Sequence, residues 1–229
     1  MGSKPHTDPV YKEKKIPKTP LRFHIQLNEE QKNAKDLIMK SKISVIRGKA
    51  GSGKSLLAAQ IALDLLHKKE FEKIIVSRPA VTASESIGFL PGTSAEKLAP
   101  FTAPVYDNMA RLLDKQTIEK FVLDGKIEVI PVGFLRGYNF SNSIVLIDEA
   151  QNLNHTQMEL VLGRMCVGSK IVICGDSAQI DLKDKKESGF DFLCKHMKDI
   201  SGFSIINLMV NHRDPIVEDI LKVYADYRS

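Results

Sequence analysis

Residues 48–55 read Gly48-Lys49-Ala50-Gly51-Ser52-Gly53-Lys54-Ser55, and this octapeptide matches the pattern G-x-x-x-x-G-K-[ST]. A short β-branched run at 43–46 precedes it, and an apolar, helix-forming run at 56–66 follows it. A strand, a glycine-rich turn and a helix in this order direct several backbone N–H groups and a helix N-terminus toward one point. The stretch therefore predicts a phosphate-binding loop, or P-loop, and with it a bound nucleoside triphosphate.

Each residue type in this loop suits phosphate binding. The glycines allow the backbone to approach phosphate oxygens without Cβ clashes. Lys54 is expected to reach the β- and γ-phosphates, and Ser55 to offer its hydroxyl to Mg²⁺. We therefore expect ATP to contact the loop, the residue after it and one upstream glutamine: Gly48, Lys49, Ala50, Gly51, Ser52, Gly53, Lys54, Ser55, Leu56 and Gln31.

The upstream glutamine lies in the run Leu27-Asn28-Glu29-Glu30-Gln31, at the start of an expected helix. A glutamine amide can both donate to and accept from the edges of adenine, so Gln31 is a candidate base contact. Asn28 is also a good N-cap, so the same residues could serve the helix terminus alone. The sequence leaves both interpretations open.

A second motif, Ile144-Val145-Leu146-Ile147-Asp148-Glu149, is an apolar strand that ends in two acidic residues, the Walker B arrangement. Asp148 is expected to hold Mg²⁺ through its water shell. Glu149 is expected to orient and deprotonate the attacking water, which indicates a hydrolase. The alternative is that the two acids only cap a following helix.

Two glutamines follow predicted strand ends, in Asp148-Glu149-Ala150-Gln151 and in Gly175-Asp176-Ser177-Ala178-Gln179. An amide can donate to a phosphate oxygen, or hold the attacking water, without competing for the metal. We therefore predict Gln179 as the sensor of the γ-phosphate and Gln151 as its coupling partner.

Strands and helices alternate along the chain, which favours a parallel sheet flanked by helices with the ligand beyond the carboxyl ends of its strands. Two candidate strands lie between the P-loop and Asp148, which favours a RecA-like core over a simple kinase core. The expected strands are 43–46, 73–77, 127–131, 143–148, 170–174 and 203–208, and the expected helices are 29–39, 56–66, 103–114, 117–123, 155–164, 188–197 and 215–224.

Composition narrows the class of protein. A chain of 229 residues with 43% hydrophobic content is long enough for one sizeable α/β domain and too short for two of this kind. Cys166, Cys174 and Cys194 show no C-x-x-C spacing, so free, buried thiols are expected. The histidines have no metal-like spacing and are interpreted as structural: His155, His196 and His212.

The N-terminal residues 1–20 are rich in lysine and proline and are expected to form a flexible basic arm, while 21–229 form the single domain. The arm could contact a nucleic-acid backbone, or it could be a solvated tail. The net charge of +5 is weak evidence for an anionic partner. The polar N-terminus and the absence of a membrane-length apolar run favour a cytoplasmic location and no membrane partner.

Together these motifs resemble the PhoH-like ATPases, relatives of the superfamily 1 helicases, over about residues 27–224. The family's R-P, G-F-L-P-G and P-x-Y-D signatures occur in order, as Arg78-Pro79, Gly88–Gly92 and Pro104–Asp107. The resemblance implies a RecA-like ATPase core, a homo-oligomeric ring such as a hexamer, and RNA helicase or RNA-processing activity. Some relatives carry a fused ribonuclease-type domain, for which this chain has no room.

Two arginines are candidate arginine fingers. Arg213 lies in Asn211-His212-Arg213, similar to the N-x-R element that presents an arginine to the γ-phosphate in superfamily 1 helicases. Those helicases complete the site with a second RecA domain, so here a second subunit is the natural donor of the missing face. We expect Arg164 or Arg213 to act as the finger, at least one of them across a subunit interface; the alternative for each is a surface salt bridge.

Basic and aromatic residues near the insert between strands are candidates for contact with single-stranded RNA or DNA. Arg78, Lys97 and Arg136 could contact the phosphate backbone. The aromatic residues Phe89, Phe101 and Tyr106 could stack on bases, although Phe89 is better explained as the core of a rigid loop.

The sequence therefore predicts a Mg²⁺-dependent ATPase that couples hydrolysis to remodelling or unwinding of nucleic acid, with RNA as the expected substrate. The alternative is an ATP-gated oligomeric switch with slow hydrolysis and no nucleic-acid substrate. A small-molecule kinase is disfavoured, because Glu149 and Gln179 suit an attacking water better than a substrate hydroxyl.

Overall fold

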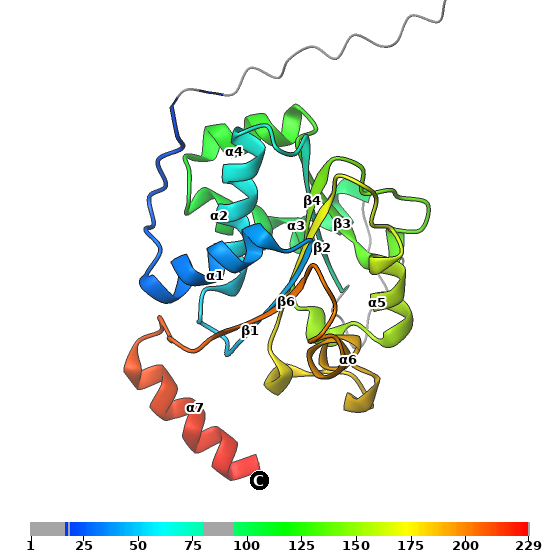
Figure 1. The fold of residues 1–229 in the computed structure, drawn as a ribbon. Coiled ribbons are helices and arrows are strands. Elements are labelled where there is room, and N and C mark those ends of the chain that lie inside the picture. The colour runs from blue at the N-terminus through cyan, green and yellow to red at the C-terminus, as the bar shows by residue number, and fades with distance from the viewer. Residues whose placement is uncertain (1–16, 18, 80–93, 229) are drawn as a thin grey trace, which may run out of the picture.

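A six-stranded, all-parallel sheet forms the centre of the fold (Figure 1). The computed structural model describes residues 17, 19–79 and 94–228. The strands are β1 (Ile43–Gly48), β2 (Lys73–Arg78), β3 (Ile127–Pro131), β4 (Ser143–Ile147), β5 (Lys170–Gly175) and β6 (Phe203–Leu208), in the order β3-β2-β4-β5-β1-β6. The prediction of a parallel sheet flanked by helices is confirmed.

The strand before the P-loop and the strand before Asp148 are not neighbours, because β5 lies between β1 and β4 and pairs with both. Ile173 of β5 pairs with Val45 on one side and with Ile147 on the other. The carboxyl ends of these three strands therefore lie side by side. This is the RecA-like arrangement that the sequence predicted, and it brings the P-loop, Asp148 and Asp176 to one edge of the sheet.

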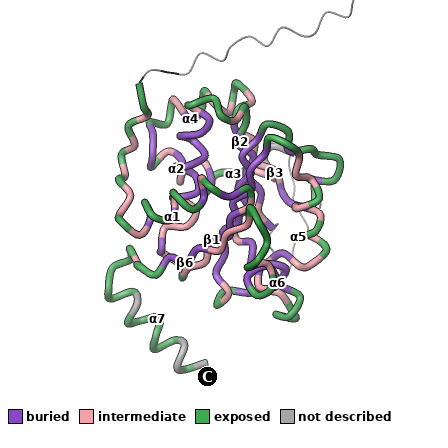
Figure 2. The backbone as a smooth tube through the Cα atoms, in the orientation of Figure 1, coloured by how far each residue is buried: buried purple, intermediate pink, exposed green. Residues whose placement is uncertain are grey.

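Helices cover both faces of the sheet (Figure 1), and the strands are largely buried between them (Figure 2). Alternate strand residues belong to two separate apolar cores. Ile144 and Leu146 belong to the core under α1, α2, α3 and α4, whereas Val145 and Ile147 belong to the core under α5 and α6. Every residue of β4 and β5 is buried, which explains the apolar runs 144–147 and 171–174. The helices are α1 (Glu29–Lys40), α2 (Lys54–His67), α3 (Ser94–Ala110), α4 (Lys115–Leu123), α5 (His155–Leu162), α6 (Gly189–His196) and α7 (Pro215–Arg228).

One predicted helix was placed wrongly. The sequence placed a helix at 103–114, whereas α3 spans Ser94–Ala110. Prolines at 100 and 104 suggested a break, but they stand four residues apart, so the N–H that Pro104 lacks is the one that would have bonded the Pro100 carbonyl. The helix ends before Asp114 because this side chain caps α4, accepting the Thr117 N–H at 2.8 Å.

The two ends of the chain differ in how they relate to this fold. Most of the predicted basic arm lies outside the described residues. At the other end, α7 projects away from the sheet below α1 (Figure 1). Within the described part of the chain, no helix combines the length and the apolarity needed to cross a membrane.

Buried Lys170, the first residue of β5, ties this strand to the end of α1. Its Nζ donates to the carbonyls of Ile38 at 2.8 Å and Met39 at 3.3 Å, and to that of Ser41. Carbonyls at a helix C-terminus have no partner within the helix, so a cation there satisfies and stabilises them. Burial lowers the pKa of Lys170.

Replacement of Lys170 by alanine is expected to lower the free energy of unfolding by about 1–3 kcal/mol, because these carbonyls lose a charged donor in a buried place and only that of Ile38 keeps a described backbone donor, the Ser41 N–H. Urea denaturation of the two proteins measures the difference. Lys198→Ala, at an exposed position, is the control and should stay within about 0.5 kcal/mol of the parent. An equally small effect at Lys170 would contradict the prediction.

Candidate nucleotide-binding site

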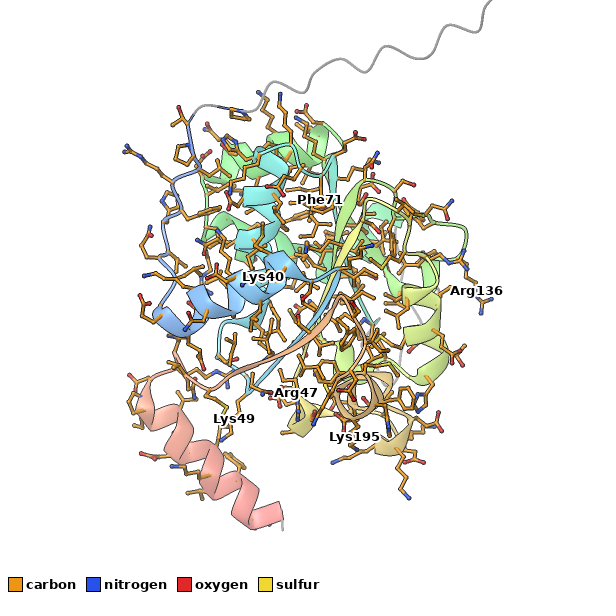
Figure 3. All side chains as sticks on the ribbon, viewed as in Figure 1. Lys40, Arg47, Lys49, Phe71, Arg136 and Lys195 are labelled. Carbon is orange, nitrogen blue, oxygen red and sulfur yellow. The ribbon has the colours of Figure 1, made fainter. Side chains whose placement is uncertain are left out.

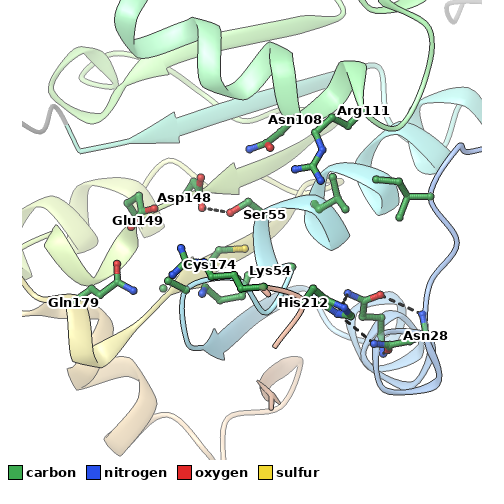
Figure 4. A pocket seen from close by; sticks show the side chains of 18 of the residues that line it. Asn28, Lys54, Ser55, Asn108, Arg111, Asp148, Glu149, Cys174, Gln179 and His212 are labelled. Carbon is green, nitrogen blue, oxygen red and sulfur yellow. Dashed lines mark hydrogen bonds between the residues drawn. The ribbon is translucent and has the colours of Figure 1, made fainter. Parts of the chain in front are cut away.

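A cavity of about 660 Å³ lies at the carboxyl edge of β1, β4 and β5 (Figure 4). This volume is in the range of sites for small organic ligands. Residues from the P-loop, from the ends of β4 and β5, from α1, from α3 and from the segment before α7 line it. Segments far apart in the sequence therefore converge on the place predicted for the triphosphate.

The predicted ATP contacts are divided between the two sides of the loop. Seven of them line the cavity: Gln31, Ala50, Gly51, Gly53, Lys54, Ser55 and Leu56. Gly48 and Lys49 lie on the other side, in a smaller cavity of about 250 Å³, and Ser52 is buried with no partner for its hydroxyl. Lys54 Nζ donates to the carbonyls of Gly48 at 2.6 Å and Lys49 at 3.0 Å, so these two backbone oxygens hold the ammonium group at the loop.

Gly53 shows why the loop requires glycine. Its φ is +82°, in the left-handed region, and a Cβ at this position would lie 2.8 Å from the amide nitrogen of Gln31. The upstream glutamine and the turn of the P-loop are therefore in direct contact, although they are 22 residues apart in sequence (53 − 31).

The chemistry predicted for Mg²⁺ fits the residues that the fold brings together. The Ser55 hydroxyl donates to Asp148 Oδ1 at 2.6 Å. A hydroxyl and a carboxylate oxygen are the hard ligands that Mg²⁺ prefers, with water completing its shell. Burial raises the pKa of Asp148 and the charge of Glu149 raises it further, while the Ser55 hydrogen bond opposes the shift.

Glu149 stands directly after Asp148, with φ 52° and ψ 34°, a left-handed backbone conformation. Its carboxylate accepts a hydrogen bond from Gln151 Nε2 at 2.8 Å. Gln151 is buried, and its amide also donates to the carbonyl of Gln179 at 3.3 Å and accepts the backbone N–H of Asp176 at 3.1 Å. The buried amide of Gln151 therefore joins Glu149, the predicted base, to the backbone of Asp176 and to the backbone of Gln179, the predicted sensor.

Gln179 lines the cavity, and its amide nitrogen donates to Asp176 Oδ2 at 2.7 Å. The same oxygen accepts the N–H of Ala50 in the P-loop at 3.0 Å. Cys174 lies beneath them, and burial raises the pKa of its thiol well above the ordinary range. All three cysteines are free, as predicted.

Both interpretations of the α1 segment find geometry in the structure. The Asn28 side chain accepts the Gln31 N–H at 2.8 Å, and Gln31 Oε1 accepts the Asn28 N–H at 3.2 Å, which forms a capping box. Gln31 and Asn28 also line the cavity. Capping is thus observed, and contact with a base stays a prediction.

His212, interpreted from the sequence as structural, lines this cavity as well. Its Nε2 lies 3.4 Å from Asn28 Nδ2 and 3.5 Å from Gln31 Nε2, and its backbone N–H donates to the carbonyl of Gly51 at 3.0 Å. Two amide nitrogens are thus directed at one ring nitrogen, which can accept hydrogen bonds from them only when it carries no proton itself. The sequence placed His212 inside the Asn211-His212-Arg213 element but did not predict its contact with α1, because that contact joins segments 181 residues apart.

The two candidate arginine fingers are placed differently. Arg213 lines the cavity, and its side chain covers Gly51, where an added Cβ would meet Arg213 Cγ at 2.7 Å. Arg164 follows α5, is half-buried, and does not belong to the cavity lining. Its carbonyl accepts the Phe140 N–H at 3.0 Å, and its buried Nε has no partner.

The candidates for nucleic-acid contact do not form a single surface. The Arg78 guanidinium lies over the Phe101 ring, 5.8 Å from its centre. Tyr106 packs against the core beside α4, and burial raises its pKa. Arg136 is exposed on the side of α5, away from the P-loop (Figure 3). Phe89 and the side chain of Lys97 lie outside the described residues, so the contacts stay a prediction.

Two residues of the α3 region line the cavity and were missed by the sequence reasoning. Asn108 and Arg111 are labelled in Figure 4 on the side opposite the P-loop turn. They stand three residues apart, so they share one face of a helical turn, and this spacing was the available signal. Arg111 adds a third cation, after Lys54 and Arg213, to the lining of a cavity predicted to bind a polyanion.

Comparison with known proteins identifies the family of this chain. A family model described as PhoH-like protein matches residues 25–225. This chain belongs to the PhoH-like proteins. A PhoH-like protein from Synechocystis is 38% identical over 189 residues, which is 82% of this chain and 58% of the relative. One from Mycobacterium bovis is 39% identical over 203 residues, which is 87% of this chain and 57% of the relative.

The PhoH-like chain described here thus spans less than three fifths of the length of these relatives (58% and 57%). Among solved structures, the UvsW helicase of bacteriophage T4 superposes with a TM-score of 0.49 at 17% identity, covering 80% of this chain and 60% of that one. The Pif1 helicase of Candida albicans gives 0.45 at 18% identity, covering 86% and 43%.

Proposed function

We propose that this PhoH-like chain is a Mg²⁺-dependent ATPase that couples hydrolysis to remodelling or unwinding of a nucleic acid, with RNA as the expected substrate. One observation carries the proposal: the Ser55–Asp148 pair, Glu149 and Gln179 all lie at one cavity beside the P-loop. A site that only binds nucleotide needs the loop and the metal residues. An acid after Asp148 and an amide donor opposite the loop are what attack by water requires.

The proposed roles follow from these positions. Glu149 takes a proton from the attacking water, and Gln179 donates its amide to a γ-phosphate oxygen. Lys54 moves from the carbonyls that hold it to the β- and γ-phosphates, where its charge stabilises the transferred group. Mg²⁺, when bound at Ser55 and Asp148, supplies charge neutralisation on the phosphate oxygens. Gln31 and His212 face the end of the cavity proposed for adenine.

The test is ATP turnover with and without single-stranded RNA and single-stranded DNA, at low and moderate salt. In a motor that moves on nucleic acid, the nucleic acid stimulates ATP turnover. Electrostatic binding of a phosphate backbone weakens steeply as the salt concentration rises. We expect a large, salt-sensitive stimulation, stronger with RNA. A flat and slow rate with either polymer would contradict nucleic-acid coupling.

A second candidate, an ATP-gated oligomeric switch, is favoured by the exposed apolar side of α7. Ile216, Ile220 and Tyr227 of this helix are 62%, 50% and 89% exposed. Helical spacing places these residues on one side, where a second copy of the chain would cover them. In this case hydrolysis would be slow and indifferent to nucleic acid. The same helix would serve a motor that works as a ring such as a hexamer.

The positions of the two arginines predict which one acts across an interface. Arg213 lines its own cavity, so we propose that it acts within its subunit, and Arg164 acts in the neighbouring site. An Arg164→Ala chain mixed with a Glu149→Gln chain is then expected to regain ATP turnover, because each subunit supplies what the other lacks. A mixture of an Arg213→Ala chain with the Glu149→Gln chain should stay inactive. Failure of the first mixture would exclude the trans role of Arg164.

A further inference from the structure

Asp176 is the nearly buried carboxylate at the end of β5, 9% exposed, and it lies between the P-loop and Gln179. Three N–H groups surround it. The Ala50 N–H and Gln179 Nε2 donate to Oδ2 at 3.0 and 2.7 Å, and the Ala178 N–H donates to Oδ1 at 3.0 Å. The carboxylate therefore bonds at once to the loop that would hold the phosphates and to the residue proposed to sense them.

The backbone of Asp176 extends the same connection. Its N–H donates to Gln151 Oε1 at 3.1 Å, and the other end of that amide donates to Glu149 Oε2 at 2.8 Å and to the Gln179 carbonyl at 3.3 Å. A displacement of Asp176 would thus reach the sensor directly and the proposed base through one buried amide.

We propose that Asp176 is a positioning residue that fixes the direction of the Gln179 amide, and that it thereby sets the preference of the site for ATP over ADP. This inference rests on the proposed function. An amide nitrogen carries two hydrogens. One of those of Gln179 is held by Asp176, so the second hydrogen has a fixed direction on a residue that lines the cavity.

A fixed donor beside the γ-phosphate acts on ATP and not on ADP, because ADP lacks that group. Pre-oriented donors also assist the reaction more than mobile ones, since no reorganisation is needed as charge develops. Loss of Asp176 should therefore lower both kcat and the ratio of ATP affinity to ADP affinity, while the affinity for ADP changes little.

The variants follow from the three donors. Asp176→Ala removes every acceptor. Asp176→Asn keeps the shape, but its NH₂ group must face at least one N–H group, so it satisfies two of the three donors at best. We expect kcat to fall by about 10- to 100-fold for Asp176→Ala, the range of a misplaced catalytic group, and by less for Asp176→Asn. Asp199→Ala, the loss of one exposed acid, is the control for charge.

The decisive measurement is a double-mutant cycle with Gln179→Ala, read as kcat and as the Kd values of ATP and ADP. If Asp176 acts through Gln179, the double variant is no worse than Gln179→Ala alone. Additive losses, an unchanged ATP to ADP ratio, or equal loss of ADP binding would each overturn the proposal, since these indicate an independent or merely structural role. Melting temperatures show whether Asp176→Ala is folded. If it is not, the same cycle is measured with Asp176→Asn in its place.

The two proposals fail in different ways. If the parent protein binds ATP but does not turn it over with or without RNA, the proposed function is wrong. The ratio of ATP to ADP affinity still tests Asp176 in that case. If the parent turns ATP over and the cycle is additive, only the role of Asp176 is lost.

Discussion

Replacement of Glu149 by glutamine is expected to leave ATP binding intact and to lower kcat by about 10²- to 10⁴-fold, the usual contribution of a general base. Glutamine has nearly the same volume and can still face Gln151, but its amide cannot take a proton from water. We propose that ATP binds through the P-loop and the Ser55–Asp148 pair, which this change does not touch. The Kd of ATP and single-turnover hydrolysis should be measured on the same preparation.

The control for this variant is Glu159→Gln, an exposed position on α5 outside the cavity, which should hydrolyse ATP like the parent. If Glu149→Gln retains the parent rate, Glu149 is not the base. If it loses ATP binding together with turnover, the carboxylate supports the site structurally.

Lys54→Ala should abolish tight ATP binding. The ammonium group is the only strong point charge that the P-loop directs at the phosphates in this class of site, and hydrogen bonds to charged groups contribute about 1.5–3 kcal/mol each. Two such bonds correspond to a loss of about 10²-fold or more in affinity. Equilibrium titration with ATP measures it.

The fold itself should tolerate this change, because in the free protein Lys54 contacts only two backbone carbonyls, those of Gly48 and Lys49, in the contacts described. Lys40→Ala, an exposed lysine at the end of α1, is the matched control and should bind ATP normally. Unchanged affinity in Lys54→Ala would remove this lysine from the proposed site.

The sequence predicted most elements of the fold because their signals are local. The P-loop pattern, the apolar runs of β4 and β5 and the Asn28 cap are all contained in a few consecutive residues. The sequence predicted a RecA-like core, but the full order of the six strands in the sheet was not predicted, since pairing depends on packing between distant segments. The bounds of helix α3 were predicted wrongly, because proline usually ends a helix and here the helix continues through two prolines.

The same difference between local signals and distant packing applies to the residues of the site. The residues that follow strands β1, β4 and β5 could be placed in advance, because the carboxyl ends of parallel strands meet at one edge. His212 and Arg111 could not, because each reaches the cavity from an element whose position only the tertiary structure determines. Arg164 was predicted as a candidate arginine finger, and its place outside the cavity lining means that a role in catalysis requires a neighbouring subunit.

The left-handed backbone of Glu149 has a consequence for the evolution of this chain. A non-glycine residue in this conformation costs roughly 1–2 kcal/mol, and glycine would avoid that cost. Selection for stability alone would therefore favour glycine at position 149, which has no side chain to act on water. Mutants selected only for resistance to heat should accumulate changes here that lose turnover, so activity and thermal robustness oppose each other at this one position.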